Sequence, residues 1–252
     1  MDKRLVVAIT LGLLGSCSAL AAEINILSAG AIEPGLAAAA DVFRKDTGIE
    51  VKIKYATAPA IQQKVGGGEA ADVVIAPPAV IDELAKAAKL DAESRVTVGK
   101  VGVGIVVRNG AAKPDVSTTD ALKRALLDAD SVVYNKASSG LYLEKLFERL
   151  GAGNNVKAKE TRYGDGAAVL EHVIKGKGKE IGFGALPEIS LYRDKGLQFV
   201  GPLPGDAQNY TSYAAALPAT PPAGGNRDGA TAFVKFLGTP AAKAAFSAKG
   251  IE

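Results

Sequence analysis

The chain has 252 residues, of which 48% are hydrophobic and 6% aromatic, and it contains no tryptophan. This length allows one large domain or two domains of roughly 100 residues, and the scarcity of aromatic residues predicts an aliphatic core. The 30 basic and 27 acidic residues nearly balance. Because nucleic-acid-binding proteins concentrate Lys and Arg on one face, the balance argues against a nucleic-acid partner.

The first 22 residues have the pattern of a secretory signal peptide. A charged segment at residues 2–4 precedes an apolar segment at residues 5–15 and the small-residue sequence Ala19-Leu20-Ala21. We therefore expect cleavage after Ala21 or Ala22 and a periplasmic protein. Residues 14–17 also resemble a lipoprotein box, so a lipid anchor at Cys17 is the less favoured alternative. Cleavage would remove the one cysteine and leave a mature chain without disulfides.

Strand-like and helix-like segments alternate along the rest of the chain. The hydrophobic periodicity predicts strands at residues 24–27, 49–55, 72–76, 101–107, 131–134, 156–161, 180–184, 197–200 and 210–217. It predicts helices after Pro34, at residues 59–65 and 79–89, from the cap at Ser117 through Ala129, and at residues 141–150, 167–175, 187–194, 228–237 and 240–249. Ser117 and Asp120 have the spacing of a capping box at the start of one of these helices.

Repeated βα units predict an α/β fold with mainly parallel sheets and helices on both faces. The number of units is high for one sheet, and helices return at the C-terminus after a long extended segment. We therefore predict two doubly wound lobes joined by two crossing segments, near residues 104–108 and 210–216. Lobe 1 would comprise residues 23–105 and 214–252, and lobe 2 residues 106–213.

The residue types give little material for catalysis. The one histidine, His172, lies in the middle of a predicted helix, where a structural role is expected. One histidine and no mature cysteine exclude His/Cys metal clusters and Cys–His nucleophiles, and the chain has neither a Gly-x-Ser-x-Gly elbow nor a P-loop. A hydrolase using Ser138 or Ser139 is a minor alternative, since no base is at hand. We expect no enzymatic activity, no cofactor and no metal.

Loops of small and hydroxyl-bearing residues follow several predicted strands. The clearest are residues 28–31, 56–58, 138–140 and 164–166. Ligands of open α/β sheets bind at the carboxyl ends of the strands, where amides at helix N-termini favour negative charge. The four loops therefore predict a site for a small anion.

Four blocks of sequence together resemble a known family. They are INILSAGAIEPGLAAAADVFRKDTGIEV, YATAPAIQQKVGGGEAADVVIAPP, ASSGLY and IGFGALPEI. Their order and spacing over about residues 24–252 are similar to type II periplasmic solute-binding proteins, specifically the molybdate-binding proteins of ABC transporters. The resemblance implies two lobes that close over a small anion of the molybdate or tungstate type. It also implies a monomer that delivers this ligand to an ABC permease in the inner membrane.

The resemblance and the loops together assign the ligand contacts to Gly30, Ala31, Thr57, Ala58, Ser138, Ser139, Gly140, Asp165 and Gly166, with a further contact near Ala185. The chain departs from the family's pattern at Ala31, around Ala58 and at Ala185, where hydroxyl-bearing residues are typical. Smaller side chains there would enlarge the cleft, so that Arg162 and Lys136 would reach a larger anion. A small organic di- or tricarboxylate is therefore the alternative ligand. A second alternative is that the same scaffold serves as an adhesin or a sensor input module.

Overall fold

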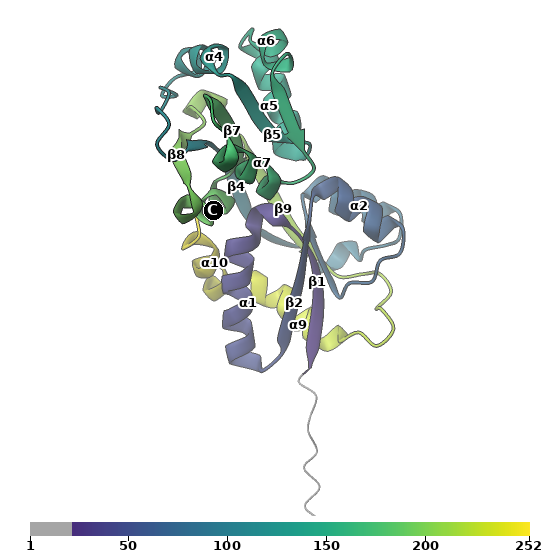
Figure 1. Cartoon of the computed structure of the whole chain (residues 1–252). Helices are drawn as coiled ribbons and strands as arrows, with labels where there is room; N and C mark the ends of the chain where they lie inside the picture. The colour runs from purple at the N-terminus through teal and green to yellow at the C-terminus, as the bar shows by residue number, and fades with distance from the viewer. Residues whose placement is uncertain (1–21) are drawn as a thin grey trace, which may run out of the picture.

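Within residues 22–252, nine strands share one sheet in the order β2-β1-β3-β9-β4-β7-β5-β6, with β8 also paired to β4. The computed structural model describes residues 22–252, and these residues form two α/β lobes (Figure 1). Residues 1–21 of the predicted signal peptide, including Cys17, lie outside this range. Within the described range, no helix is long and apolar enough to cross a bilayer.

Lobe 1 is the part of the chain built around the first hydrophobic cluster, which contains Ile26, Val74 and Phe233. Its strands are β1 (Glu23–Ala29), β2 (Glu50–Ala56), β3 (Val73–Ala76), β9 (Tyr210–Ala216) and the first half of β4 (Val96–Arg108). Its helices are α1 (Glu33–Thr47), α2 (Ala58–Gly66), α3 (Pro78–Lys86), α9 (Arg227–Leu237) and α10 (Pro240–Ser247), with 3-10 turns η1 (Gly30–Ile32) and η2 (Ala92–Ser94).

Local sequence signals define the helices of lobe 1. Helix α1 begins with a proline in its first turn and ends at Gly48, which has a left-handed backbone conformation with φ of 72°. Phe43 of α1 lies edge-on to Phe233 of α9, with ring centroids 5.0 Å apart. Helices α1, α9 and α10 therefore cover one face of the lobe 1 strands, whereas α2 and α3 cover the other (Figure 1).

Lobe 2 contains the other two clusters, which lie on opposite faces of its strands. Its strands are the second half of β4 with β5 (Ser131–Asn135), β6 (Glu160–Tyr163), β7 (Glu180–Ala185) and β8 (Leu197–Pro202). Its helices are α4 (Thr119–Asp128), α5 (Ser138–Arg149), α6 (Gly153–Lys157), α7 (Gly166–Lys175) and α8 (Leu186–Ser190), with 3-10 turns η3 (Arg193–Lys195) and η4 (Gly205–Ala207).

Period-two alternation assigns the side chains of lobe 2 to these two clusters. Ile105 and Val132 pack under α4, α5 and α6, whereas their neighbours Val106 and Val133 pack under α7 and α8. Both faces of the strands are buried, as expected for a doubly wound sheet.

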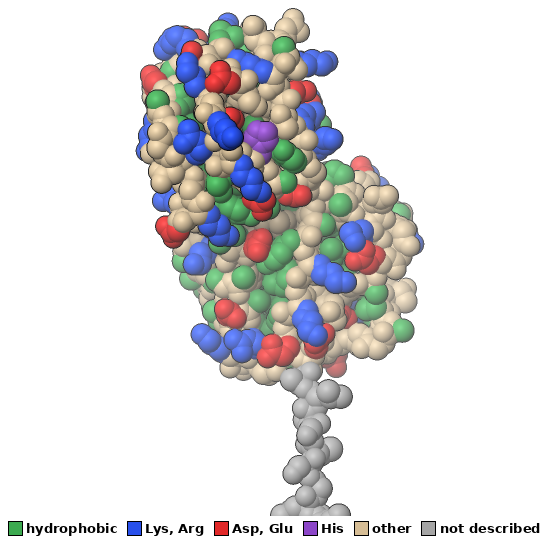
Figure 2. Space-filling model, in the orientation of Figure 1, with side chains coloured by type: hydrophobic (Ala, Val, Ile, Leu, Met, Phe, Trp, Pro, Cys, Tyr) green, Lys and Arg blue, Asp and Glu red, His purple; other side chains and the backbone are tan. Residues whose placement is uncertain are grey.

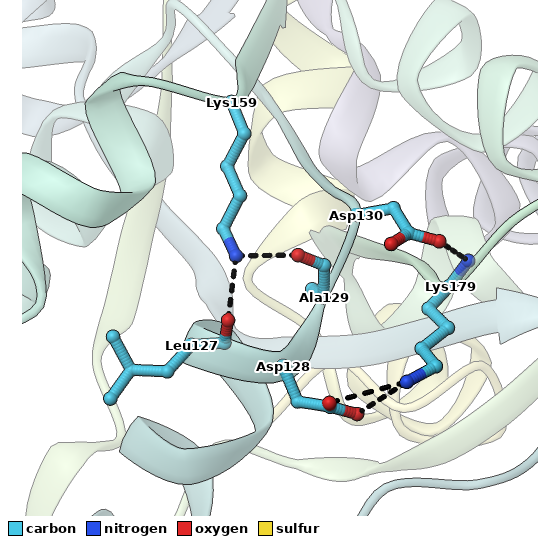
Figure 3. Close-up of polar contacts among 6 residues, drawn as sticks. All are labelled: Leu127, Asp128, Ala129, Asp130, Lys159 and Lys179. Atoms are coloured by element: carbon cyan, nitrogen blue, oxygen red, sulfur yellow. Dashed lines mark hydrogen bonds and ion pairs between the residues drawn. The ribbon is translucent and has the colours of Figure 1, made fainter.

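Polar contacts fix the turn between α4 and β5 (Figure 3). The Lys159 ammonium donates hydrogen bonds to the carbonyl oxygens of Leu127, at 2.9 Å, and Ala129. The Lys179 amide donates to Asp130 Oδ2 at 2.8 Å, and its ammonium pairs with Asp128. The Lys159 bonds cap carbonyls at the end of α4, and the Lys179 contacts hold the neighbouring carboxylates, at the edge of lobe 2 remote from lobe 1.

Two antiparallel strands, β4 and β9, join the lobes. Residues 96–102 of β4 pair with β9, and residues 103–108 pair with β7 and β8. The core side chains change lobe between Val101 and Val103. This change lies just before residues 104–108, near which the first crossing was predicted, and the division of the chain at residues 105 and 213 remains a prediction.

Some local expectations were wrong. The outer strands are parallel, but the crossing strands pair antiparallel, so the sheet is mixed rather than mainly parallel. The segment at 156–161 begins as helix α6, because Ala152 and Val156 are both buried at helical spacing. Thr118, rather than Ser117, caps α4, accepting a hydrogen bond from the Ala121 amide at 3.1 Å.

Candidate functional site

A cleft of about 510 Å³ lies between the lobes, at the carboxyl ends of the parallel strands. It is lined from lobe 1 by residues following β1 and β2, and from lobe 2 by residues following β5, β6 and β7. Its size is in the range of small-molecule sites in proteins.

The lobe 1 wall is formed by the end of β1, by η1 and by the start of α2. Gly30 and Ala31 form the turn after β1. Thr57 is the N-cap residue of α2, but its hydroxyl makes no capping hydrogen bond and is free to meet a ligand. The first-turn amides of α2, including that of Ala58, are not used by their own helix. This wall therefore offers the Thr57 hydroxyl and several N–H donors beside small alanine side chains.

The lobe 2 wall is formed by the N-termini of α5 and α7. Ser138 and Ser139 are the first two residues of α5, and Asn135 holds this turn in place. Asn135 Oδ1 accepts from the Ala137 amide at 2.9 Å and from the Gly140 amide at 3.2 Å, and its Nδ2 donates to Ser139 Oγ at 3.2 Å. These bonds leave the Ser138 hydroxyl facing the cleft beside the N-terminus of a helix.

Asp165 caps α7 by accepting a hydrogen bond from the Ala168 amide at 2.8 Å. The amides of Gly166 and Ala167, in the first turn of α7, remain available at the cleft. Both walls therefore present helix N-termini to the same volume, an arrangement that suits a ligand with negatively charged oxygens.

The charged side chains of the cleft are all acidic. Glu33, Asp165 and Glu188 line it, and no Lys or Arg is among the described lining residues. Figure 2 shows acidic side chains at the waist where the lobes meet. A negative ligand in this cleft would therefore meet neutral donors and helix dipoles rather than a counter-charge.

Glu188 is the unusual member of this set. It lies in α8, directly after β7, and its side chain is only 8% exposed. Its carboxylate packs against Gly166, where a Cβ atom would overlap it. Burial, with added repulsion from Glu33 and Asp165, raises the pKa of Glu188 to about 7. The group is therefore poised between its neutral and charged forms near neutral pH.

Tyr213 of β9 lies on the cleft beside this carboxyl group. Burial and the nearby Glu188 raise the pKa of the Tyr213 phenol above its ordinary value. The phenol therefore stays protonated and can donate a hydrogen bond to a ligand.

Most of the residues expected at the site line the cleft. They are Gly30, Ala31, Thr57, Ala58, Ser138, Ser139, Asp165 and Gly166, together with Ala185.

Gly140 and Arg162 do not line the cleft. The Gly140 amide donates to Asn135, and a Cβ at this glycine would overlap the Asn135 carbonyl, so Gly140 is required for the turn itself. Arg162 forms an ion pair with Glu144 of α5, and its guanidinium lies 4.9 Å from the centroid of the Tyr134 ring.

Lys136 is exposed and also lies outside the lining. The expectation that cationic side chains reach into the cleft was therefore wrong. Arg162 and Tyr134 alternate with neighbours that face the other side of their strands, and both point under α5.

Sequence reasoning missed Glu188, Asn135 and Tyr213. A signal was present for the first two, because a polar residue directly after a buried parallel strand lies at the ligand-binding edge of the sheet. Asn135 ends β5, and Glu188 stands between Pro187 and Ile189 just beyond β7. Tyr213 belongs to an antiparallel crossing strand, whose position depends on the tertiary fold.

His172 makes a structural contact, as expected. Its Nδ1 lies 2.8 Å from the Tyr163 hydroxyl, on the outer part of α7 and away from the cleft lining. Within residues 22–252, no group of three or more His, Cys, Asp or Glu side chains is arranged to hold a metal ion.

Comparisons with known proteins identify the family of this chain. Residues 24–252 match the family model of the bacterial extracellular solute-binding proteins. An aconitate isomerase from a Pseudomonas species is 34% identical over 215 residues, which cover 81% of this chain and 80% of the relative.

Two solved structures share the fold at low sequence identity. The periplasmic molybdate-binding protein of Azotobacter vinelandii has a TM-score of 0.74 at 18% identity, over 91% of this chain and 98% of that protein. A sulfate-binding protein of Mycobacterium tuberculosis has a TM-score of 0.73 at 22% identity, over 91% and 86%. The fold is thus that of type II periplasmic binding proteins, and the chain belongs to the bacterial extracellular solute-binding protein family.

Proposed function

We propose that the cleft captures a small organic acid with two or three carboxyl groups, in a periplasmic receptor that delivers the acid to an ABC permease. The observation that carries this proposal is the lining of the cleft. Hydroxyls and helix N-terminal amides from both lobes face a volume of about 510 Å³ that contains no cationic side chain. Ligand contacts from both lobes would favour the closed form of the protein.

Two features favour an organic acid over a compact oxyanion. Ala31, Ala58 and Ala185 line the cleft and leave room that a five-atom oxyanion would not fill. The buried Glu188 carboxyl, in its neutral form, can donate a hydrogen bond to a ligand carboxylate. The isomerase relative acts on aconitate, a tricarboxylic acid, which supports the same ligand class.

A molybdate-type oxyanion is the second candidate, because a protein of similar fold binds molybdate. Helix N-terminal amides suit such an oxyanion too. The organic acid is larger than the oxyanion and would contact more of the cleft lining. A binding experiment with both kinds of ligand distinguishes the two candidates.

The test is a thermal-shift panel on the mature chain with trans-aconitate, citrate, succinate, molybdate, tungstate and sulfate. A ligand present at one hundred times its dissociation constant adds about 2.7 kcal/mol of stability, or about 5–10 °C in a chain of this size. We expect shifts with the tricarboxylates and none with sulfate. Shifts with molybdate and tungstate alone would replace the organic acid by the oxyanion, and no shift with any of them would refute the proposal.

A further inference from the structure

We propose that Glu188 moves a proton on the bound acid, so that the cleft also isomerises the double bond of an unsaturated tricarboxylic acid. This inference rests on the proposed ligand class and adds a reaction to it. It would make the protein an enzyme as well as a receptor, which the composition of the sequence did not lead us to expect.

The geometry sets Glu188 apart from the other two carboxylates of the cleft. Asp165 is exposed and is committed to capping α7, whereas Glu33 is half-buried in the first turn of α1. Glu188 is buried and lines the cleft, and its carboxylate lies against Gly166, where a side chain would displace it. A base that must reach a C–H bond needs such a fixed position within contact distance of the ligand.

The surroundings of Glu188 also control its charge. Glu33 comes from α1, Asp165 from the start of α7, Tyr213 from β9 and Tyr192 from the turn between α8 and η3. None of these groups is cationic, so no opposite charge offsets the burial of the carboxylate. The raised pKa of Glu188, about 7, gives it the basicity that general acid–base catalysis at neutral pH requires.

The reaction is a proton shift between two carbon atoms. In trans-aconitate, a CH₂ group lies between a carboxylate and the carbon–carbon double bond. A Glu188 oxygen takes one proton from this CH₂, and the electron pair of the broken C–H bond forms a new double bond to the central carbon. The electron pair of the former double bond moves to the far carbon and its carboxylate. Glu188 then returns its proton to that far carbon.

One proton is removed and one is added, so the reaction needs no oxidant, reductant or second substrate. The double bond re-forms on the other side of the central carbon, with cis or trans geometry set by how the far carboxylate is held. The negative charge that develops on a carboxylate would be stabilised by donors of residues that line the cleft, namely the Ser138 hydroxyl and the amides of Gly166 and Ala167.

The experiment incubates the mature protein with trans-aconitate in deuterium oxide. Proton NMR follows two readouts, loss of the CH₂ signal by exchange and appearance of the cis isomer, while thermal shift with the same acid reports binding. We expect the wild-type chain to show both readouts. Glu188→Gln keeps the size and a hydrogen-bond donor but lacks the base, so it should retain binding and lose both rates by at least 100-fold.

Two further variants sharpen the test. Glu188→Asp keeps a carboxylate but withdraws it by one methylene, and it should keep a measurable part of the exchange rate. Glu171→Gln removes an acid from the exposed side of α7 and should leave both rates unchanged. The wild-type kcat/KM should rise about tenfold per pH unit up to about pH 7 and then level off, as Glu188 becomes ionised.

The outcomes distinguish this inference from the proposed function. Binding of the acid without exchange or isomerisation in the wild-type chain would overturn the inference and leave the receptor function intact. Undiminished rates in Glu188→Gln would assign the proton transfer to another group. A chain that binds none of the organic acids would refute both proposals.

Discussion

Replacing Glu188 by glutamine should stabilise the protein at alkaline pH. The buried carboxyl has a pKa of about 7 in the folded protein, against an ordinary value of 4.5. Since each pKa unit corresponds to about 1.4 kcal/mol, ionising Glu188 costs roughly 3 kcal/mol more in the folded protein than in the unfolded chain. Glutamine has the same shape and never ionises, so the variant avoids this cost.

The direction of the pH dependence follows from the raised pKa. Below about pH 4.5, Glu188 is protonated in both states and its ionisation does not alter the free energy of unfolding. Between about pH 4.5 and 7, the folded protein holds a proton that the unfolded chain has released, so stability falls as the pH rises. Above pH 7 the full cost is present. The advantage of Glu188→Gln should therefore grow from near zero at pH 4.5 to about 3 kcal/mol at pH 8.

Urea denaturation at several pH values measures this difference directly. At pH 8 the variant should also melt about 6–12 °C higher than the wild-type chain. Glu171→Gln, on the exposed side of α7, is the matched control and should change stability by less than about 0.5 kcal/mol at every pH. A Glu188→Gln variant that is equally stable or less stable than the wild-type chain at pH 8 would refute the reasoning.

Three other substitutions test the site and its supports. Thr57→Val removes a free hydroxyl from the cleft and should weaken binding of the organic acid by about 10- to 100-fold in isothermal titration. The control Thr220→Val, in the exposed loop after β9, should leave this affinity unchanged. Arg162→Ala should leave the affinity within about twofold, because its guanidinium pairs with Glu144 outside the cleft; a large loss would bring Arg162 back into the site. Gly140→Ala should lower the free energy of unfolding by about 1–3 kcal/mol, since its Cβ overlaps the Asn135 carbonyl, and an unchanged urea midpoint would contradict that geometry.

Much of the fold could be predicted because its signals are local. The buried run at β3 and the proline at the start of α1 fix element types without knowledge of the rest of the chain. The point at which β4 changes lobe could not be predicted in this way. Val101 and Val103 are both buried valines on one continuous strand, and only their tertiary neighbours assign them to different cores.

The site was predictable to the extent that it consists of small residues at strand ends. Thr57 and Ser138 stand directly after β2 and near the end of β5, so the order of elements brings them to the same edge. The direction in which a strand side chain points was harder to predict. Arg162 belongs to a short, half-buried strand with no alternation in its burial, so the sequence did not reveal that it faces α5. The acidity of the cleft arises from three segments far apart in the chain, at residues 33, 165 and 188.

The position of β9 also determines the order in which the chain can fold during its synthesis. Lobe 2 is built from one continuous stretch, from Val103 to Ala207, and can assemble soon after that stretch is made. Lobe 1 cannot do the same, because its first 80 or so residues lack β9 and the two helices that supply Phe233 and Phe246 to its core. Even the last residue takes part, since the Glu252 amide and carbonyl both pair with Lys100 of β4. The core of lobe 1 is therefore complete only once residues 210–252 have joined its first three strands.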